Sequence, residues 1–186
     1  MQTLSKSWTA SLFGLALLGV SQLVIADDQE KVDESRAVSA NEKIYIEVMS
    51  GEIKINAVSS GKFSVVGKLD EKATGYTLDS KDGFTRFEMT MPRQINYNWK
   101  DKVNAAELTF EVPVGSSVEF KGVNGNVTVQ GIHGSSQIGT VNGDIKATDL
   151  RNQVALNTVN GEIKLKGGSG KVELSSVNGK IDDEGS

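Results

Sequence analysis

The chain has 186 residues and contains no cysteine, one histidine and two prolines. Without cysteine, disulfides, thiolate metal sites and a lipid-modified cysteine are all excluded. One histidine and no cysteine give little basis for Ser-His-Asp or Cys-His catalysis, because both depend on a base positioned beside a nucleophile. The formal net charge is −4 and no block of basic residues occurs, so we do not expect nucleic-acid binding.

Glycine is abundant, with 20 residues against two prolines, whereas aromatic residues make up only 6% of the chain. No long helical pattern occurs, and short alternating apolar segments are separated by turns that contain glycine. The length suits one domain. These features predict an all-β, single-domain protein.

The N-terminus has the layout of a cleaved secretory signal. Met1–Lys6 supplies one positive charge, Ala10–Val20 is short and mostly apolar, and Val24-Ile25-Ala26 precedes two aspartates. The apolar run is too short for a firm assignment as a membrane span, although an uncleaved N-terminal anchor is the alternative. We therefore predict an exported protein, periplasmic, cell-surface or extracellular, with no stable membrane span after signal cleavage.

One tripeptide, Val-Asn-Gly, recurs every 18 residues, at 123–125, 141–143, 159–161 and 177–179. A fixed period of this kind is typical of a solenoid, in which each repeat is one coil stacked on the next. We predict a parallel β-helix-like β-solenoid domain over residues 42–186, with regular 18-residue coils at 123–181. A signal peptide over residues 1–26 and a flexible lead-in over residues 27–41 are predicted to precede it.

Each coil has alternating apolar positions, counted from the valine as position 1. Positions 5 and 7 carry aliphatic residues such as Ile163 and Leu165, and positions 14 and 16 carry residues such as Val154 and Leu156. Residues two apart share one face of a strand, so each coil should hold two short strands with inward side chains. The valine at position 1 is expected to point inward as a third core residue. Stacking at about 4.8 Å would then close a shared core.

Two known repeat types of similar period fit poorly. Calcium-binding rolls use Gly-Gly-x-Gly-x-Asp, which does not occur here. Left-handed hexapeptide helices need an aliphatic residue at every sixth position, and Ser135, Gln153 and Lys171 break that register. A right-handed or irregular two-sheet coil is therefore favoured.

More irregular strands and a hairpin are expected before the regular array. Alternating apolar residues predict strands at 43–48, 62–69 and 107–112. Residues 76–91 predict a β-hairpin, because Asp82-Gly83 supplies the positive-φ turn that joins twisted strands.

The Val-Asn-Gly tripeptides are interpreted as coil corners and not as a ligand site. Glycine at position 3 suits a corner that needs a positive φ or a close approach of two backbones. Asparagine at position 2 can bond to the backbone there, and stacked asparagines can form an amide ladder. The predicted structural repeat corners are Asn124, Gly125, Asn142, Gly143, Asn160, Gly161, Asn178 and Gly179.

A family resemblance rests on two neighbouring segments. Residues 108–118 read Leu-Thr-Phe-Glu-Val-Pro-Val-Gly-Ser-Ser-Val, and residues 122–129 read Gly-Val-Asn-Gly-Asn-Val-Thr-Val. They resemble the bacterial putative-adhesin family of β-strand-repeat proteins, a domain of unknown function. The resemblance extends over Leu108–Ile181, and more loosely over Ile44–Ile55.

This resemblance implies an exported β-solenoid of the envelope or cell surface, and no functional residue is carried over from it. The chain departs from longer members of the family at residues 181–186, where Asp183 occupies an inward apolar position. Two readings of the acidic tail stay open. Either it guards an exposed strand edge against end-to-end pairing, or the chain is a shortened relative.

Candidates for ligand chemistry are few. The aromatic-polar loop formed by Tyr97, Trp99 and Lys100, together with Arg93, is the best candidate, because aromatic rings beside amides and cations can bind sugar. Covering the core is the alternative role of this loop. His133 is expected to be a solvated turn residue, and we predict no catalytic residue, metal site or cofactor.

These observations favour a non-enzymatic exported envelope or surface protein, an adhesin-like binding or structural module. Its expected partner is an unidentified protein or polysaccharide, and self-association through the terminal coil is a further expectation. The alternative is a carbohydrate-active β-helix enzyme that acts on an envelope or extracellular polysaccharide. Its stacked acids would be Asp144 and Glu162 at position 4, although lysines at position 6 suggest exposed ion pairs instead.

Overall fold

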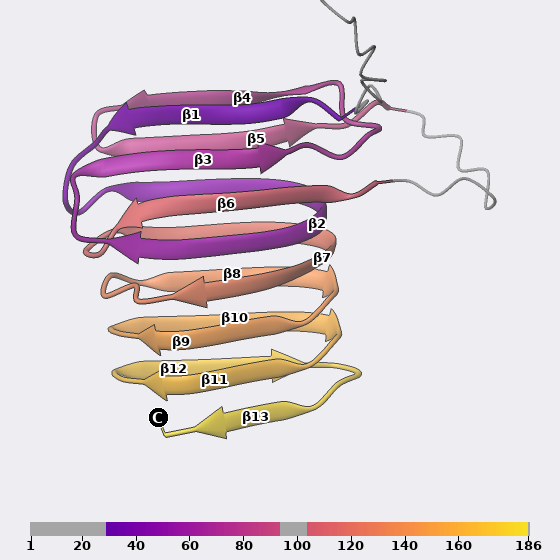
Figure 1. Cartoon of the computed structure of the whole chain (residues 1–186). Coiled ribbons are helices and arrows are strands. Elements are labelled where there is room, and N and C mark those ends of the chain that lie inside the picture. Colours follow the sequence, from indigo (N-terminus) through magenta and orange to yellow (C-terminus); the bar gives the residue numbers. More distant parts are fainter. Residues whose placement is uncertain (1–28, 94–103, 186) are drawn as a thin grey trace, which may run out of the picture.

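The computed structural model describes residues 29–93 and 104–185, and every regular element within these ranges is a β-strand (Figure 1). The predicted signal peptide therefore lies outside the described residues. The strands are β1 Lys31–Ala37, β2 Lys43–Val58, β3 Lys62–Lys68, β4 Gly75–Lys81, β5 Phe84–Thr90, β6 Ala106–Pro113, β7 Ser117–Gln130, β8 Ser136–Asn142, β9 Ile145–Leu150, β10 Gln153–Asn160, β11 Ile163–Gly168, β12 Lys171–Ser176 and β13 Ile181–Glu184. A search of these residues for a helix that could span a membrane finds none. The all-β prediction is thus confirmed for this part of the chain.

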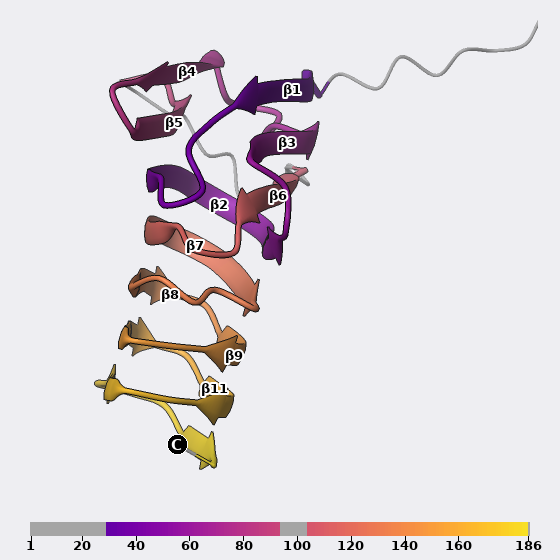
Figure 2. The same ribbon diagram turned by 90° about the vertical axis from the view of Figure 1, so that its left-hand side faces the viewer.

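The strands form two stacks that share the long strands β2 and β7. We call them stack A and stack B. Stack A runs in the order β4, β5, β2, β7, β8, β10 and β12, and uses the first halves of β2 and β7. Stack B runs in the order β1, β3, β6, β2, β7, β9, β11 and β13, and uses their second halves. Figure 2 shows the two stacks side by side along the molecule.

The 18-residue period of the sequence is also the period of strand pairing. In stack A, Ser136 pairs with Val154, and Val154 pairs with Val172. In stack B, Ile145 pairs with Ile163, which in turn pairs with Ile181. All of these pairings are parallel and in register, so equivalent side chains of successive repeats lie directly above one another.

The aliphatic residues at the predicted inward positions form the core. Ile138 and Leu156 of stack A are fully buried, as are Ile145 and Ile163 of stack B. Ile132 and Leu150, at position 10, are also fully buried. The last repeat is less well covered, because Val172 and Leu174 are only partly buried. Burial therefore confirms the assignment of positions 5, 7, 14 and 16 in the inner repeats, and position 10 is inward there as well.

The prediction for the valine at position 1 is wrong. Val141 and Val159 are each 39% exposed, and Val177 is 70% exposed. The preceding residue faces the core instead, as the buried Thr140 shows. Because side chains alternate along a strand, a buried position 18 places the next valine on the outer face.

The N-terminal end of the molecule contains three antiparallel pairs, which join the parallel array where β5 and β6 pair with β2. The predicted hairpin is confirmed: β4 pairs with β5, and Asp82 and Gly83 adopt φ angles of 53° and 78° at its turn. Strands β1, β3 and β6 are antiparallel neighbours in stack B. Phe63 and Phe110 pack with ring centroids 6.1 Å apart, and Phe87 lies 5.2 Å from Phe110. Aromatic side chains thus fill this end of the core.

The prediction of a flexible lead-in over residues 27–41 is wrong for its central part. Residues 31–37 form strand β1, which pairs with β3 along its whole length. Only Val32 of this strand is fully buried. An edge strand with one inward apolar residue carries almost no alternation, so its sequence reads as polar coil although pairing with β3 makes it a strand.

Candidate functional site

The asparagines at the corners form a ladder along the surface of the array. Asn142 Nδ2 donates a hydrogen bond to Asn124 Oδ1 at 2.8 Å, Asn160 Nδ2 to Asn142 Oδ1 at 2.7 Å, and Asn178 Nδ2 to Asn160 Oδ1 at 2.9 Å. The amide ladder expected from the repeat is therefore present. The side-chain amides of Asn142 and Asn160 each donate one hydrogen bond to the preceding repeat and accept one from the next repeat. These hydrogen bonds hold adjacent coils in register.

The corner glycines are needed because two backbones approach closely. A Cβ on Gly143 would overlap the carbonyl oxygen of Gly125, and a Cβ on Gly161 would overlap that of Gly143. Neither glycine has a φ angle in the left-handed region. Thr158 Oγ1 also donates to the Gly143 carbonyl oxygen at 3.1 Å. Of the two explanations that the sequence allowed, close approach applies here and positive φ does not.

The acidic residues at position 4 also take part in contacts between coils. Asp144 Oδ1 accepts a hydrogen bond from the Glu162 backbone N–H at 2.8 Å, and Asn126 Oδ1 accepts one from the Asp144 N–H at 3.0 Å. Glu162 forms an ion pair with Lys164 at 3.3 Å. Asp144 and Glu162, the two stacked acids of the carbohydrate-active alternative, therefore have structural partners. Among residues 29–93 and 104–185, no group of three or more acidic or histidine side chains is arranged to hold a metal ion.

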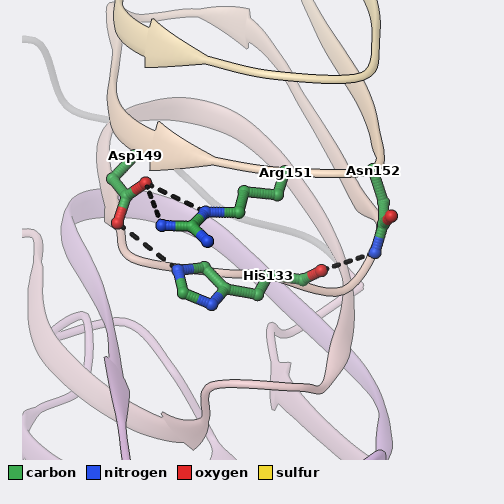
Figure 3. A network of polar contacts seen from close by, with 4 residues as sticks. All are labelled: His133, Asp149, Arg151 and Asn152. Atoms are coloured by element: carbon green, nitrogen blue, oxygen red, sulfur yellow. Dashed lines mark hydrogen bonds and ion pairs between the residues drawn. The ribbon is translucent and has the colours of Figure 1, made fainter.

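His133 joins two successive turns (Figure 3). Its Nε2 lies 3.4 Å from Asp149 Oδ2, and Asp149 Oδ1 lies 3.3 Å from Nε and Nη2 of Arg151. Asn152 Nδ2 donates to the His133 carbonyl oxygen at 2.6 Å. The hydrogen bond from His133, followed by the charge of Arg151, lowers the pKa of Asp149 below its usual range. The half-exposed His133 is thus a turn residue, as expected, with a defined carboxylate partner.

The outer face of stack A carries a cluster of aromatic and charged side chains around Tyr45. Arg86 and Lys121 lie 4.9 Å and 5.2 Å from the centre of the Tyr45 ring. Because β5 and β7 lie on opposite sides of β2, one cation comes from each neighbouring strand. Tyr45 Oη donates to Glu47 Oε2 at 2.5 Å, and this hydrogen bond raises the pKa of Tyr45. The cluster ties three strands together on the exposed side of the sheet.

A cleft of about 260 Å³ lies beside this cluster on the same face, and we call it the Phe84 cleft. Its outward-facing side chains come from five neighbouring strands and the turns next to them. They are Lys43, Tyr45, Phe84, Ser117, Glu119, Ser135, Gln137, Gln153 and Ala155. Phe84 was expected in a hairpin and not among the site residues. The available signal was that Phe84 is out of phase with the alternation of Phe87 and Met89 on the same strand.

A second, shallower groove of about 400 Å³ runs along the outer face of stack A near the ends of its strands. The exposed valines Val141, Val159 and Val177 line it together with small residues such as Gly139 and Ser175. The valines that were expected in the core therefore form an apolar row on the surface.

The predicted ligand loop is only partly placed. Arg93 is exposed and ends the first described range. Tyr97, Trp99 and Lys100 lie outside the described residues, so their proposed role stays a prediction. Nothing in the described part of the chain brings Arg93 to the Phe84 cleft.

No protein-family model and no curated protein matches the chain. The structure is similar to a crystal structure described as a "putative cell adhesion protein" from Clostridium sporogenes, with 12% sequence identity and a TM-score of 0.55, covering 84% of this chain and 100% of the other. A "putative adhesin" from Bacteroides fragilis shows 15% identity and a TM-score of 0.36, with 83% and 97% of the two chains covered. At such identities the first similarity concerns the fold. It agrees with the adhesin-type family that the sequence resembles.

Proposed function

We propose that the protein is a non-enzymatic, exported, adhesin-like binding module of the cell envelope or surface, built on a β-solenoid. The observation that carries this proposal is the outer face of stack A. Seven strands present their outward side chains there, and the face bears both the Phe84 cleft and the valine-lined groove. A flat face with such hollows suits the binding of an extended partner.

The solenoid part of the proposal is supported by the pairing pattern. Strands β8, β10 and β12 follow one another at 18-residue intervals in stack A, and β9, β11 and β13 do so in stack B. Each repeat thus contributes one strand to each stack, as a coil does. The asparagine and glycine contacts at the corners join one repeat to the next.

The non-enzymatic part is supported by the contacts of the titratable residues. Asp144 accepts a hydrogen bond from the next coil, and Glu162 forms an ion pair with Lys164. His133 and Asp149 join two turns. These contacts give each group a structural role that needs no substrate. No observation in the described residues favours the carbohydrate-active alternative.

Export is supported by the signal-like layout of residues 1–26. The Clostridium protein of similar fold is named for cell adhesion, which fits a surface location. Expression of the full chain in a bacterial host, followed by fractionation and N-terminal sequencing of the product, tests this step. We expect the envelope or medium fraction to hold a product that begins at Asp27. A product that starts at Met1 and stays in the cytoplasm would contradict export.

Binding is tested with the purified product on surfaces coated with envelope extract, defined polysaccharides and host matrix proteins. We expect retention on at least one of these surfaces. Ala155→Arg, which adds a charged side chain to the outer face of stack A, should lower it. Thr128→Arg makes the same change in charge at an exposed position of stack B and serves as the matched control. No retention on any surface would overturn the proposed function.

Self-association through the terminal coil is a separate part of the proposal. Among the described residues, β12 and β13 each pair with a strand on one side only. An open strand edge favours pairing with another chain, whereas the acidic residues of β13 oppose it. Light scattering at rising salt concentration tests this balance. We expect a larger mass at high salt, and an unchanged monomer at every salt concentration would exclude self-association.

A further inference from the structure

We propose that the Phe84 cleft binds a neutral saccharide. This inference rests on the proposed function and specifies the ligand class of one site on its binding face. It depends on the exposed aromatic ring, the unpaired amides and the balanced charge of the cleft.

The fold presents the Phe84 ring to solvent. Phe84 follows the turn of the β4–β5 hairpin, and the Lys43 backbone N–H donates to the Gly83 carbonyl oxygen at 3.0 Å, which fixes the turn against β2. The Phe84 side chain is 43% exposed, whereas Phe87 on the same strand is fully buried. Single exposed apolar side chains are common on protein surfaces, so it is the position of this ring at the edge of a hollow that marks it as a candidate ligand contact.

The hollow comes from short outward side chains, which are those of Ser117, Ser135 and Ala155. Ala155 pairs in register with Gln137 on β8 and with Glu173 on β12, so it is the smallest of three outward neighbours. The longer side chains of Gln137 and Gln153 border the space above it. Phe84 on β5 therefore lies at one end of the cleft and the two amides on β8 and β10 at the other, three to four strand spacings of about 4.8 Å away, with the short side chains of Ser117, Ser135 and Ala155 along the floor.

These groups match the chemistry of a short saccharide, with one ring on Phe84 and a later ring at the amides. The C–H groups on one face of a pyranose can pack against an aromatic ring, which presents a negative face. Its hydroxyls need groups that both donate and accept, and each glutamine amide offers both. In the described part of the chain, neither Gln137 nor Gln153 forms a side-chain hydrogen bond with another protein group. Their hydrogen-bonding capacity is available to a ligand.

The charges around the cleft favour a neutral ligand. Lys43 and Glu119 are the two charged side chains that line it, and they have opposite signs. Glu119 is also paired with Lys121 at 2.9 Å. Tyr45 forms part of the wall, but Arg86 and Lys121 already contact its ring, so Phe84 is the stacking surface. The formal charges that line the cleft thus cancel, and since Lys121 already neutralises Glu119, the tetragalacturonate probe below tests whether Lys43 attracts an anion instead.

A peptide strand is a poorer fit. Addition of a strand needs an open sheet edge with unpaired backbone groups. The cleft lies on the face of β5, β2, β7, β8 and β10, where β2, β7 and β8 have a paired strand on each side. The open cleft of about 260 Å³ holds a short saccharide segment, so we expect a Kd on the order of 1 mM for one site. Several copies on a surface would raise the apparent affinity.

The test is a ¹⁵N NMR titration of the full exported product with four neutral tetrasaccharides, built from glucose in α or β linkage, mannose, or N-acetylglucosamine. A tetragalacturonate serves as the charged probe. We expect at least one neutral probe to shift the signals of Phe84 and of the Gln137 and Gln153 side-chain amides. Phe84→Ala should weaken that binding at least tenfold, and Gln137→Ala and Gln153→Ala a few-fold each.

Val66→Ala is the matched control, because Val66 is 51% exposed on β3 and lies outside the cleft. It should leave the titration unchanged, and the thermal unfolding of every variant shows whether it is folded. If Phe84→Ala does not fold, the glutamine variants test the same prediction. No shift with any neutral probe, shifts confined to residues outside the cleft, or tighter binding of tetragalacturonate would each overturn the proposal.

The surface-binding assay separates this proposal from the proposed function. If the wild-type chain is retained on coated surfaces but no neutral probe shifts the cleft signals in the NMR titration, the saccharide cleft is wrong and the binding module stands. If the wild-type chain is retained on no surface, the proposed function fails as well.

Discussion

The core between stack A and stack B is filled by different side chains at the N-terminal end of the molecule and in the repeat array. Around β1, β3, β5 and β6 the core contains the fully buried Phe63, Phe87 and Phe110. In the array it contains isoleucine, leucine, valine and alanine, as at Ile138, Ala147 and others. The first region uses antiparallel pairs, and the second only parallel pairs in register.

The difference shows two ways of closing a β-stack. Similar coils can stack only if equivalent positions carry side chains of similar size. The array therefore depends on the asparagine ladder and on glycines that allow neighbouring backbones to approach closely. The N-terminal end has no such restriction and can bury side chains that occur there only once, including a carboxylate. Glu42, for example, is almost fully buried and accepts hydrogen bonds from Thr85 Oγ1 at 2.9 Å and Ser39 Oγ at 2.6 Å. Its stability should therefore depend on a few residues, and that of the array on many.

The largest effect is expected from Phe110→Ala. Phe110 contacts both Phe63 and Phe87, so its removal leaves a cavity at the centre of the N-terminal core. We expect the free energy of unfolding to fall by about 3–5 kcal/mol. Denaturant unfolding measured by circular dichroism checks this value. Leu174→Ala, at the partly buried last repeat, should cost only about 1 kcal/mol, and an equal loss in both variants would contradict the comparison.

Gly161→Ala should show the array's dependence on close backbone approach. The added methyl group would overlap the Gly143 carbonyl oxygen, so adjacent coils must move apart. We expect a loss of about 1–3 kcal/mol or more in the free energy of unfolding. Gly139→Ala is the control, because its methyl group would meet nothing closer than 3.9 Å. It should change the stability by less than about 0.5 kcal/mol, and equal losses would show that close approach is not the reason for the corner glycine.

Much of this architecture could be predicted from the sequence because it is periodic or local. The 18-residue spacing predicted the pairing of Ile145 with Ile163, and Asp82-Gly83 predicted the hairpin turn. The outward orientation of the Val141 side chain could not be derived in the same way. It depends on the residue at which the strand of stack A ends and the chain crosses to stack B. The pattern of positions 14 and 16 does not reveal that point.

The Phe84 cleft was beyond prediction for a different reason. It extends from Phe84 on β5 to Gln153 and Ala155 on β10, and these residues line one cleft only because β2, β7 and β8 lie between the two strands on the same face. Pairing of β5 with β2 follows no repeat in the sequence. A hollow floored by Ser117, Ser135 and Ala155 is visible only once this order of strands is known.

The asparagine ladder should contribute a smaller and graded amount. Asn160 forms hydrogen bonds with both Asn142 and Asn178, whereas Asn178 forms only the one with Asn160 among the described asparagines. Asn160→Ala should therefore cost about 1–2 kcal/mol in the free energy of unfolding, and Asn178→Ala about half as much. Asn160→Asp keeps the shape and the acceptor but loses the donor to Asn142. Denaturant unfolding in which all three variants match the wild type would show that the ladder does not stabilise the array.

The smallest effect concerns the exposed contact between His133 and Asp149. The hydrogen bond from His133 is the largest cause of the lowered pKa of Asp149, and the charge of Arg151 acts in the same direction. Since the folded-state pKa is depressed, the stabilisation from this contact is fully present above the unfolded-state pKa of about 3.9 and is lost as the pH falls through the folded-state pKa. An NMR titration of the Asp149 side chain checks the direction. His133→Ala should raise the pKa of Asp149 toward its usual value, and Arg151→Gln should raise it less. A pKa unchanged by His133→Ala would show that the two turns are held by the Asn152 hydrogen bond to the His133 carbonyl oxygen without help from the imidazole.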